Sequence, residues 1–193
     1  MSKINDAIYK RYEVPKKVTV LVDTREKYPM IFPDVVHVAH PFLNYSSLAI
    51  QVETKKQKLD VGDYMLGEYP DVCIIERKAS QLELYKNLME SRDSIRQAKA
   101  FRKLAATAEY PVLLVEASPT ELLRKRTKKP WIKNPEIIVS KLSLAVAKYG
   151  FNVVFIPWKA RNYQTRRKVG TLLVHMMVAY AVYPHFEVVP NPL

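Results

Sequence analysis

The hydrophobic pattern divides the chain into a first part of short apolar runs and a second part in which such runs alternate with helical periodicity. Short apolar runs bounded by turn residues predict buried strands, whereas apolar residues spaced three and four apart predict helices. The strands that we expect on this basis cover residues 18–23, 47–53, 60–66, 72–78, 112–117 and 152–157.

Three helices are predicted among these strands. The first begins at Ser80, a favourable N-cap, and continues to about Ala106. The second begins at the Asn-Pro pair 134–135 and ends at Gly150, and the last covers roughly residues 162–183. The apolar side of the first helix consists of Leu82, Tyr85, Leu88, Met89, Ile95, Ala98, Phe101 and Ala105. A meander of strands followed by alternating strands and helices is typical of an α/β sandwich with a mixed sheet.

The composition agrees with one soluble domain inside the cell. The 193 residues are 48% hydrophobic and 26% charged, and the only cysteine, Cys73, has no partner for an internal disulfide. The N-terminus lacks the apolar segment of a signal peptide, and the uncharged run Val169–Tyr183 is shorter than the roughly 18 residues of a membrane span. We therefore expect no membrane partner and a location in the cytoplasm of a prokaryote or virus-infected host, or in a eukaryotic nucleus.

Glycine and histidine usage excludes several enzyme classes. Only four glycines are present, so neither a GxGxxG motif nor a Walker A loop can be written. His37 and His40 have HxxH spacing but lack the glutamate and the helical setting of zinc proteases, so we expect both to be loop residues.

Positive charge is concentrated in one stretch of the chain. The formal net charge is +12, and residues 121–170 hold thirteen lysines and arginines against two acids, a net charge of +11. A local positive field of this kind favours a polyanionic partner. The alternative is a solvated basic surface that binds nothing specific.

Two carboxylates and a lysine form the strongest candidate site. Glu76 and Lys78 alternate with Arg77 along one predicted strand, so they project to the same side, about 6.6–7 Å apart. Asp63 lies on the preceding strand of a predicted hairpin and can approach Glu76 across it. Mg²⁺, for which Mn²⁺ can substitute, favours such oxygen ligands, and a neighbouring lysine can orient water or offset charge on a phosphate. A structural ion pair is the alternative.

Three motifs in chain order sharpen this interpretation: VDTRE at 22–26, VGDY at 61–64 and IIERK at 74–78, followed by a helix and the strand PVLLVE. Together they resemble the XPF/Hef-type nuclease domain of the PD-(D/E)xK restriction-endonuclease-like superfamily. The resemblance implies a three-layer α/β sandwich with a central mixed sheet flanked by helices. It also suggests a polar arm at 1–17, the nuclease domain at 18–183 and a tail at 184–193.

The resemblance assigns roles to individual residues. Asp63 and Glu76 would be ligands of Mg²⁺ or Mn²⁺, with Asp23 as a further acid bordering the metal. Lys78 would be the catalytic lysine, and Arg77 the basic residue needed for cleavage. The family has another acid after its ERK motif and a spacer of three residues, where this chain has Leu82; Glu83 is the candidate to replace it.

Two basic segments are candidates for DNA contact. Arg92, Arg96, Lys99 and Lys103 form one stripe on the first helix, and the connection RKRTKKPWIK at 124–133 adds six basic residues and a tryptophan. Basic residues bind phosphates, and an aromatic ring can stack on an unpaired base. The alternatives are a solvated helix face and a flexible loop with Trp131 in the core. The predicted DNA-binding residues are Arg25, Arg92, Arg96, Lys99, Lys125, Arg126, Lys128, Lys129 and Trp131.

The segment 172–182 is apolar on nearly every side, which indicates either deep burial or contact with a second subunit. Because related nuclease domains pair through their C-terminal helices, we expect a homodimer. Relatives usually carry a helix-hairpin-helix module or a helicase as well. We therefore expect targeting here to come from this domain, a partner or a second copy.

The resulting hypothesis is a metal-dependent endonuclease that hydrolyses phosphodiester bonds in branched, flapped or single-strand-containing DNA. One alternative is a catalytically inactive member of the same family that binds DNA or serves as a scaffold. Another is an enzyme of the superfamily that acts on RNA or has no structure preference.

Overall fold

A computed structural model describes residues 14–39, 47–128, 131–157 and 162–182. In this part of the chain one mixed sheet has the strand order β2-β3-β1-β4-β5-β6-β7. Strands β1 and β3 are parallel, as are β5, β6 and β7, whereas β2 and β4 run antiparallel to their neighbours. The strands are β1 (Lys17–Asp23), β2 (Val35–Ala39), β3 (Ser47–Gln57), β4 (Tyr64–Leu66), β5 (Cys73–Lys78), β6 (Tyr110–Val115) and β7 (Asn152–Phe155).

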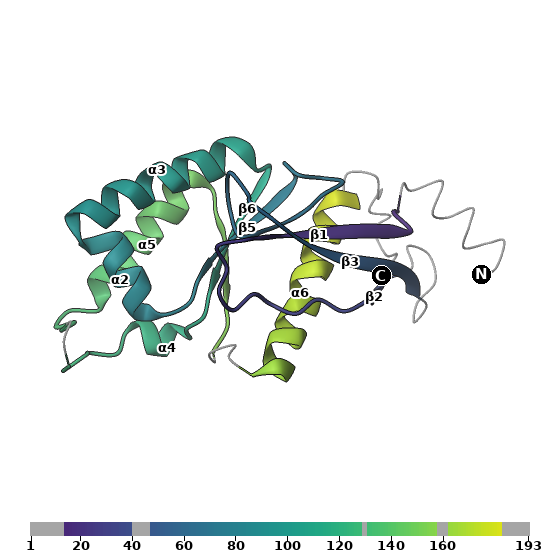
Figure 1. The fold of residues 1–193 in the computed structure, drawn as a ribbon. Coiled ribbons are helices and arrows are strands. Elements are labelled where there is room, and N and C mark those ends of the chain that lie inside the picture. The colour runs from purple at the N-terminus through teal and green to yellow at the C-terminus, as the bar shows by residue number, and fades with distance from the viewer. Residues whose placement is uncertain (1–13, 40–46, 129–130, 158–161, 183–193) are drawn as a thin grey trace, which may run out of the picture.

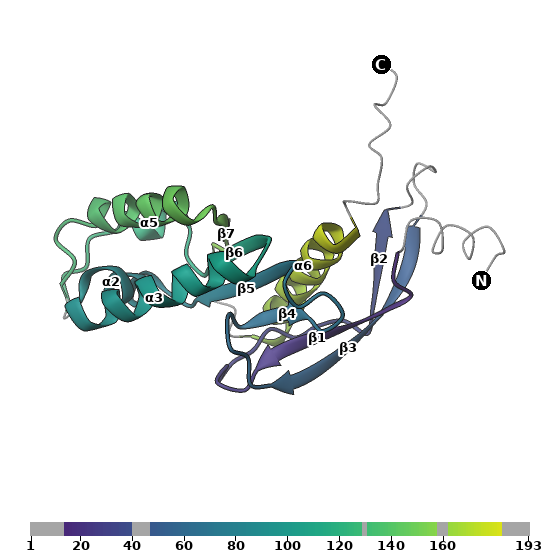
Figure 2. The same ribbon diagram turned by 90° about the horizontal axis from the view of Figure 1, so that it is seen from above.

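Helices cover both faces of the sheet. Figures 1 and 2 show α2, α3 and α5 on one side and α6 on the other. The alternation of strand side chains divides the core accordingly: Ile74 and Leu113 pack toward the first group, whereas Ile75 and Leu114 pack toward α6. The helices are α2 (Gln81–Met89), α3 (Ser91–Thr107), α4 (Pro119–Leu122), α5 (Glu136–Tyr149) and α6 (Tyr163–Val182). The predicted three-layer α/β sandwich is confirmed.

The first predicted helix is in fact two helices, α2 and α3, separated at Glu90 in an extended conformation. Leu84 is the buried residue of α2, whereas Phe101 and Leu104 are buried in α3. At 3.6 residues per turn, one continuous helix would place Leu84 about 100° from Phe101 and about 160° from Leu104 around its axis. The break lets both segments bury their apolar sides, and it leaves Ile95, predicted to be on the apolar side, 73% exposed.

Strand β2 was not predicted. His37 lies within it, paired with Ala49 of β3, so its assignment to a loop was wrong. The strand has only five residues, of which only Val36 is fully buried, so its pattern is weak, and pairing with the longer β3 stabilises it. His40 lies outside the described residues.

Helix α6 is apolar because it packs on the sheet. Eight of its residues are buried, among them Leu173 and Met177, while Leu172 is 45% exposed. Gly170 is required for this packing, since a Cβ there would lie 2.1 Å from the carbonyl oxygen of Ile31. Among the described residues, no helix is long and apolar enough to cross a membrane.

Candidate active site

The turn before β4 brings Asp63 to β5. Gly62 has φ +69°, and a Cβ there would lie 2.3 Å from Ile74 Cγ2, so only glycine fits this close approach. The Asp63 N–H then donates to the Ile75 carbonyl at 2.8 Å, and the Arg77 N–H donates to Asp63 Oδ2 at 2.7 Å. The predicted hairpin between β4 and β5 is present, although Asp63 precedes the strand instead of lying within it.

Lys78 is nearly inaccessible to solvent, with 4% of its surface exposed. Its Nζ lies 2.6 Å from Glu76 Oε1 and 3.0 Å from Gln97 Oε1 on α3. An ammonium has three donors, and these contacts occupy two of them. The side chain is therefore held in place beside Glu76 while retaining a donor. Gln97 Nε2 is buried without a hydrogen-bond partner among the described residues.

Glu83 faces the same lysine. Its Oε1 lies 3.9 Å from Lys78 Nζ, and its Oε2 accepts from the Ala79 N–H at 2.9 Å. Ser80 Oγ accepts in turn from the Glu83 N–H, which fixes the start of α2. Leu82 points away and lines a cavity described below. Glu83, and not the residue at position 82, is thus the acidic residue of α2 that lies next to the candidate site.

Asp63 carries the clearest electrostatic signal. Burial and the neighbouring Glu76 raise the pKa of its carboxyl group to about 7, against the hydrogen bond from Arg77, which lowers it. Two acids close together in a poorly solvated position favour one retained proton. Binding of either a proton or a cation would reduce the repulsion between the two carboxylates.

Asp23 has a different environment. It ends β1 at 1% exposure, and Arg25 Nε and Nη2 donate to its two carboxylate oxygens at 2.8 and 2.6 Å. The backbone N–H groups of Arg25 and Leu59 donate to the same carboxylate, and these interactions lower its pKa to about 2. Asp23 therefore anchors the loop next to the site, and its N–H donates to the Asp63 carbonyl at 3.0 Å.

Arg77 points to the other face of β5. Its Nε lies 2.6 Å from Glu116 Oε1, and its Nη1 lies 2.5 Å from Glu26 Oε2. Tyr64 donates to the same Glu26 oxygen at 3.2 Å, and the Tyr28 carbonyl accepts from Arg77. The guanidinium thus joins β5 to the segments that follow β1 and β6 through partners of opposite charge.

The donor set of the site suits a hard divalent cation. Asp63 and Glu76 supply carboxylate oxygens, and no group of three or more His, Cys, Asp or Glu side chains converges anywhere in the described residues. Mg²⁺ is held by one or two carboxylates with several water ligands, and so fits such a pair. Asp63 and Glu76 would hold the cation. Asp23 would support them indirectly, through the hydrogen bond from its N–H to the Asp63 carbonyl.

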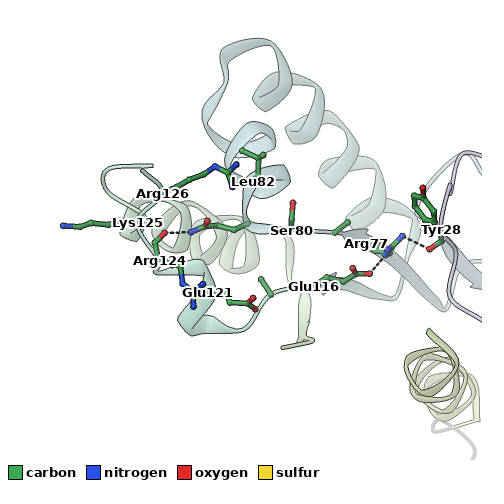
Figure 3. A pocket seen from close by; sticks show the side chains of 12 residues that line it. Tyr28, Arg77, Ser80, Leu82, Glu116, Glu121, Arg124, Lys125 and Arg126 are labelled. Carbon is green, nitrogen blue, oxygen red and sulfur yellow. Dashed lines mark hydrogen bonds and ion pairs between the residues drawn. The ribbon is translucent and has the colours of Figure 1, made fainter. Parts of the chain in front are cut away.

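A cavity of about 780 Å³ lies beyond the carboxyl ends of β5 and β6 (Figure 3). Tyr28 and Arg77 line one end, and the first turn of α2 lines its side. At the other end are three consecutive basic residues, Arg124, Lys125 and Arg126, of which the last two were predicted to bind DNA. Ligands of α/β proteins commonly bind outside the carboxyl ends of the strands.

The other predicted DNA-binding residues lie on two separate surfaces. Figure 1 shows α3 and α4 on opposite sides of α2, so the exposed Arg92, Arg96 and Lys99 are apart from the basic connection. Arg96 pairs with Asp93 at 3.0 Å.

In the basic connection, Arg126 and Ile132 exchange backbone hydrogen bonds, and Ile132 is buried. Trp131 is 53% exposed, so it does not fill the core. Lys128 is also exposed, and Lys129 lies outside the described residues.

Sequence reasoning placed Glu26 beside Asp23 but did not identify Gln97 or Glu116 as part of the site. Glu116 ends a strand motif that had been noticed, but its pairing with Arg77 needs the parallel register of β5 and β6. Gln97 lies one turn before the buried Phe101 on the same face of α3, but a polar residue gives no hydrophobic signal of burial.

A mixed sheet with helices on both faces, and paired carboxylates beside a buried lysine at its centre, is the arrangement of an XPF-type nuclease domain. Residues 22–160 match the ERCC4 domain, and the chain belongs to this family. A comparison with curated proteins finds no match.

Solved structures share the fold. XPF from Aeropyrum pernix matches with a TM-score of 0.50 and 16% identity, over 80% of this chain and 61% of that one. XPF from Aeropyrum pernix in complex with DNA matches with a TM-score of 0.51 and 16% identity, over 86% of this chain and 66% of the other. The chain thus spans less than two thirds of the length of either.

Proposed function

We propose that this protein is a metal-dependent endonuclease that hydrolyses phosphodiester bonds in branched, flapped or single-strand-containing DNA. The observation that carries the proposal is the convergence of Asp63, Glu76 and Lys78. Burial raises the pKa of Asp63 to about 7, and Glu76 lies beside it with its own lysine at 2.6 Å. Membership of the ERCC4 domain family supports a role in DNA processing.

The chain's own residues have distinct tasks in this proposal. Asp63 and Glu76 hold the cation, and Asp23 fixes the backbone next to them. Lys78, held by Glu76 and Gln97, directs its remaining donor toward the attacking water or a phosphate oxygen and offsets charge in the transition state. Bound Mg²⁺ would polarise the phosphate and lower the pKa of a water ligand.

DNA is the substrate class that the charge distribution supports. Residues 121–170 carry a net charge of +11, and part of that charge lines the cavity beyond the carboxyl ends of β5 and β6. A structure of similar fold is described as a complex with DNA.

A cleavage panel tests the proposal directly. Flap, fork, four-way junction, single strand and plain duplex, each as DNA and as RNA, are incubated with Mg²⁺, Mn²⁺ or EDTA. We expect metal-dependent nicking of the branched DNA substrates. Preferential cleavage of RNA, or tight DNA binding with no cleavage of any substrate, would replace the proposal with one of the alternative hypotheses.

We also propose a homodimer formed through the exposed side of α6. Leu172 and Ala179 are exposed on a helix whose other side is fully buried, and Met176 lies half-buried between them. Light scattering at tens of micromolar should give a dimer mass, and Leu172→Glu should give a folded monomer. The control Leu144→Glu, at an exposed position of α5, should leave the dimer intact. A monomeric wild-type protein would contradict this proposal alone.

A further inference from the structure

Figure 2 shows α5 alongside α2 and α3, and a groove of about 340 Å³ lies between these helices. Its apolar lining consists of Leu88, Ala98, Phe101, Leu144, Ala145 and Tyr149. Leu144 is 66% exposed, so a large apolar side chain of this lining is open to water. An apolar surface of this kind, bordered by polar residues, is typical of a site for another molecule.

The groove is separate from the candidate active site and from the basic stripe on α3. Ser94, Ala98 and Phe101 line it with the spacing i, i+4 and i+7 of one helix face. At about 100° per residue, Arg96 and Lys99 project more than about 120° away from that face. Neither the two carboxylates nor the lysine of the candidate site lines the groove.

The charge of the groove is positive and comes from one helix. Lys141 and Lys148 are exposed residues of α5 that line it, and among its described lining residues none is acidic. Leu144 lies between the two lysines on the same face of α5. Seven residues of an α-helix rise about 10.5 Å, so the two cations flank the apolar centre at this spacing. A segment with acidic residues on both sides of an apolar one matches the groove in charge and length.

One buried donor that lines the groove lacks an acceptor. Gln97 is 7% exposed, and in the described part of the chain its Nε2 forms no hydrogen bond. The orientation of this amide is defined, because Lys78 has only donors and its Nζ, 3.0 Å away, requires the oxygen Oε1. A buried donor without a partner is unfavourable, so the arrangement favours an occupant that supplies an oxygen acceptor.

We propose that the groove binds an acidic amphipathic helix of a partner protein. Apolar side chains of that helix pack on Leu144 and Phe101, and its acidic residues pair with Lys141 and Lys148. One of its carboxylate or amide oxygens accepts a hydrogen bond from Gln97 Nε2. Helices bind apolar grooves in this way, through anchors spaced at i, i+3, i+4 and i+7. DNA fits the groove less well, because its phosphates would lie against an apolar lining.

The partner helix acts on the candidate active site through Gln97. This residue lines the groove, and the oxygen of its amide accepts from Lys78. An acceptor on Nε2 restricts rotation of the amide and so holds Oε1 on the lysine. Binding in the groove therefore increases the cleavage rate. This step rests on the proposed function, whereas the docking site itself does not.

Selection of displayed helical peptides tests the chemistry of the occupant. A library that allows acidic, basic and apolar residues on every side of the helix is selected on the wild-type protein in EDTA, with excess duplex DNA present. We expect the enriched peptides to carry acidic residues on both sides of an apolar residue. Failure to enrich such peptides, or enrichment of basic ones, would overturn the proposal.

Charge reversal locates the binding site. By fluorescence anisotropy, Lys141→Glu with Lys148→Glu should weaken an enriched peptide by about tenfold or more. Lys55→Glu with Lys56→Glu makes the same change in charge at exposed positions of β3 and should weaken the peptide by less than about twofold. Equal losses in the two variants would indicate unspecific attraction to a basic protein and contradict the proposal.

The apolar centre has its own pair of variants. Leu144→Gln should weaken the peptide by about fivefold, because it removes an exposed apolar anchor. Leu123→Gln changes an exposed leucine that does not line the groove and should have no effect. Loss of the dimer mass in the variant with both α5 lysines reversed would assign the groove to a second copy of the chain. Competition by a short single strand as effective as that by unlabelled peptide would assign it to nucleic acid. Either result would overturn the proposal.

NMR tests the contact with Gln97. The side-chain amide signal that is missing from Gln97→Glu should move when the peptide binds to the wild-type protein, because Nε2 gains an acceptor. Gln97→Glu keeps an oxygen for Lys78 but has no donor for the peptide, so the affinity should fall about tenfold. An unmoved signal with unchanged affinity would overturn the contact and its effect on Lys78.

Kinetics separate this inference from the proposed function. A saturating peptide should raise kcat about threefold with KM unchanged in the wild-type protein, and should not do so in Gln97→Glu. Metal-dependent cleavage without peptide binding in the groove would leave the nuclease and remove the docking site. Peptide binding through the groove in a protein that cleaves nothing would leave the docking site and remove the nuclease. A bound peptide that does not change kcat in an active enzyme would overturn the coupling through Gln97.

Discussion

The two faces of β5 carry two charge clusters with opposite character. On the α6 side, Arg77 lies between Glu26 and Glu116, and each charge has a partner within 2.6 Å. On the side of α3, Lys78 pairs with Glu76, but Asp63 has no cationic partner at such a distance among the described residues, and its pKa rises to about 7. Every charge of the first cluster is paired without a ligand, whereas one carboxylate of the second cluster is not.

This difference separates stabilising charge from functional charge. Both clusters are buried and both come from the three-residue sequence Glu-Arg-Lys, so neither burial nor composition distinguishes them. Buried ion pairs that satisfy each other contribute to structure, whereas carboxylates without sufficient positive charge attract a cation. The role predicted for Arg77 in cleavage remains a prediction, and its contacts add a structural role.

The largest effect is expected from the incomplete cluster. Glu76→Gln removes a negative ligand and Lys78→Ala removes the positioned ammonium, so each should reduce the cleavage rate by about 10²–10³-fold or more. DNA affinity in EDTA should stay within twofold, and Lys86→Ala is the exposed control. Cleavage that persists in both variants would locate the chemistry elsewhere.

Arg77→Met should act mainly on stability. It leaves Glu26 and Glu116 buried without their cation, and breaking a buried pair in this way costs about 3–5 kcal/mol. Urea denaturation measures the change in the free energy of unfolding. The matched control is Lys17→Met, which breaks the exposed pair with Glu53 and should cost less than about 1 kcal/mol. Equal effects of the two variants would contradict the contrast between the clusters.

The pH dependence of the metal-free protein should reveal Asp63. Its pKa is raised from 3.8 to about 7, so the folded state retains a proton that the unfolded chain has lost. The stabilising contribution is complete below about pH 4 and is lost as the pH rises through 7. The free energy of unfolding in EDTA should therefore decrease between pH 5 and pH 8 by a few kcal/mol, and Asp63→Asn should flatten this decrease.

A bound cation should reverse that loss. At pH 8, Mg²⁺ at 100 times its dissociation constant should stabilise the fold by about 2.7 kcal/mol, and Asp63→Asn should abolish the gain. An identical pH profile in wild type and Asp63→Asn would show that another group controls the pH dependence.

The smallest effect is expected at Gln97, a positioning residue for Lys78. Gln97→Met removes the acceptor at 3.0 Å and should lower kcat about tenfold with KM unchanged, because the lysine is less well oriented. Gln97→Glu keeps an oxygen at this position and should restore most of the rate. Failure of Gln97→Glu to recover activity, with both variants equally stable, would reduce Gln97 to a packing role.

Local patterns predicted most of the elements that position the site. Strands β1, β5 and β6 and helices α5 and α6 were expected close to their observed bounds, because each buries an unbroken apolar run or ends at a clear signal such as Gly150. The weak elements were missed. Strand β2 depends on pairing with β3, and the break at Glu90 lets α2 and α3 pack Leu84, Phe101 and Leu104 into the same core cluster.

The sequence by itself determined the fold class. It also determined that Glu76 and Lys78, which we propose act in catalysis, share one face of a strand, because alternate strand residues project to the same side whatever surrounds them. Only the tertiary structure decided which charges are compensated. Glu116 reaches Arg77 through the register of β5 and β6, Gln97 reaches Lys78 through packing of α3, and the cavity forms where α2 meets the basic segment. Compensation depends on distances between residues far apart in the chain, and local sequence patterns do not encode those distances.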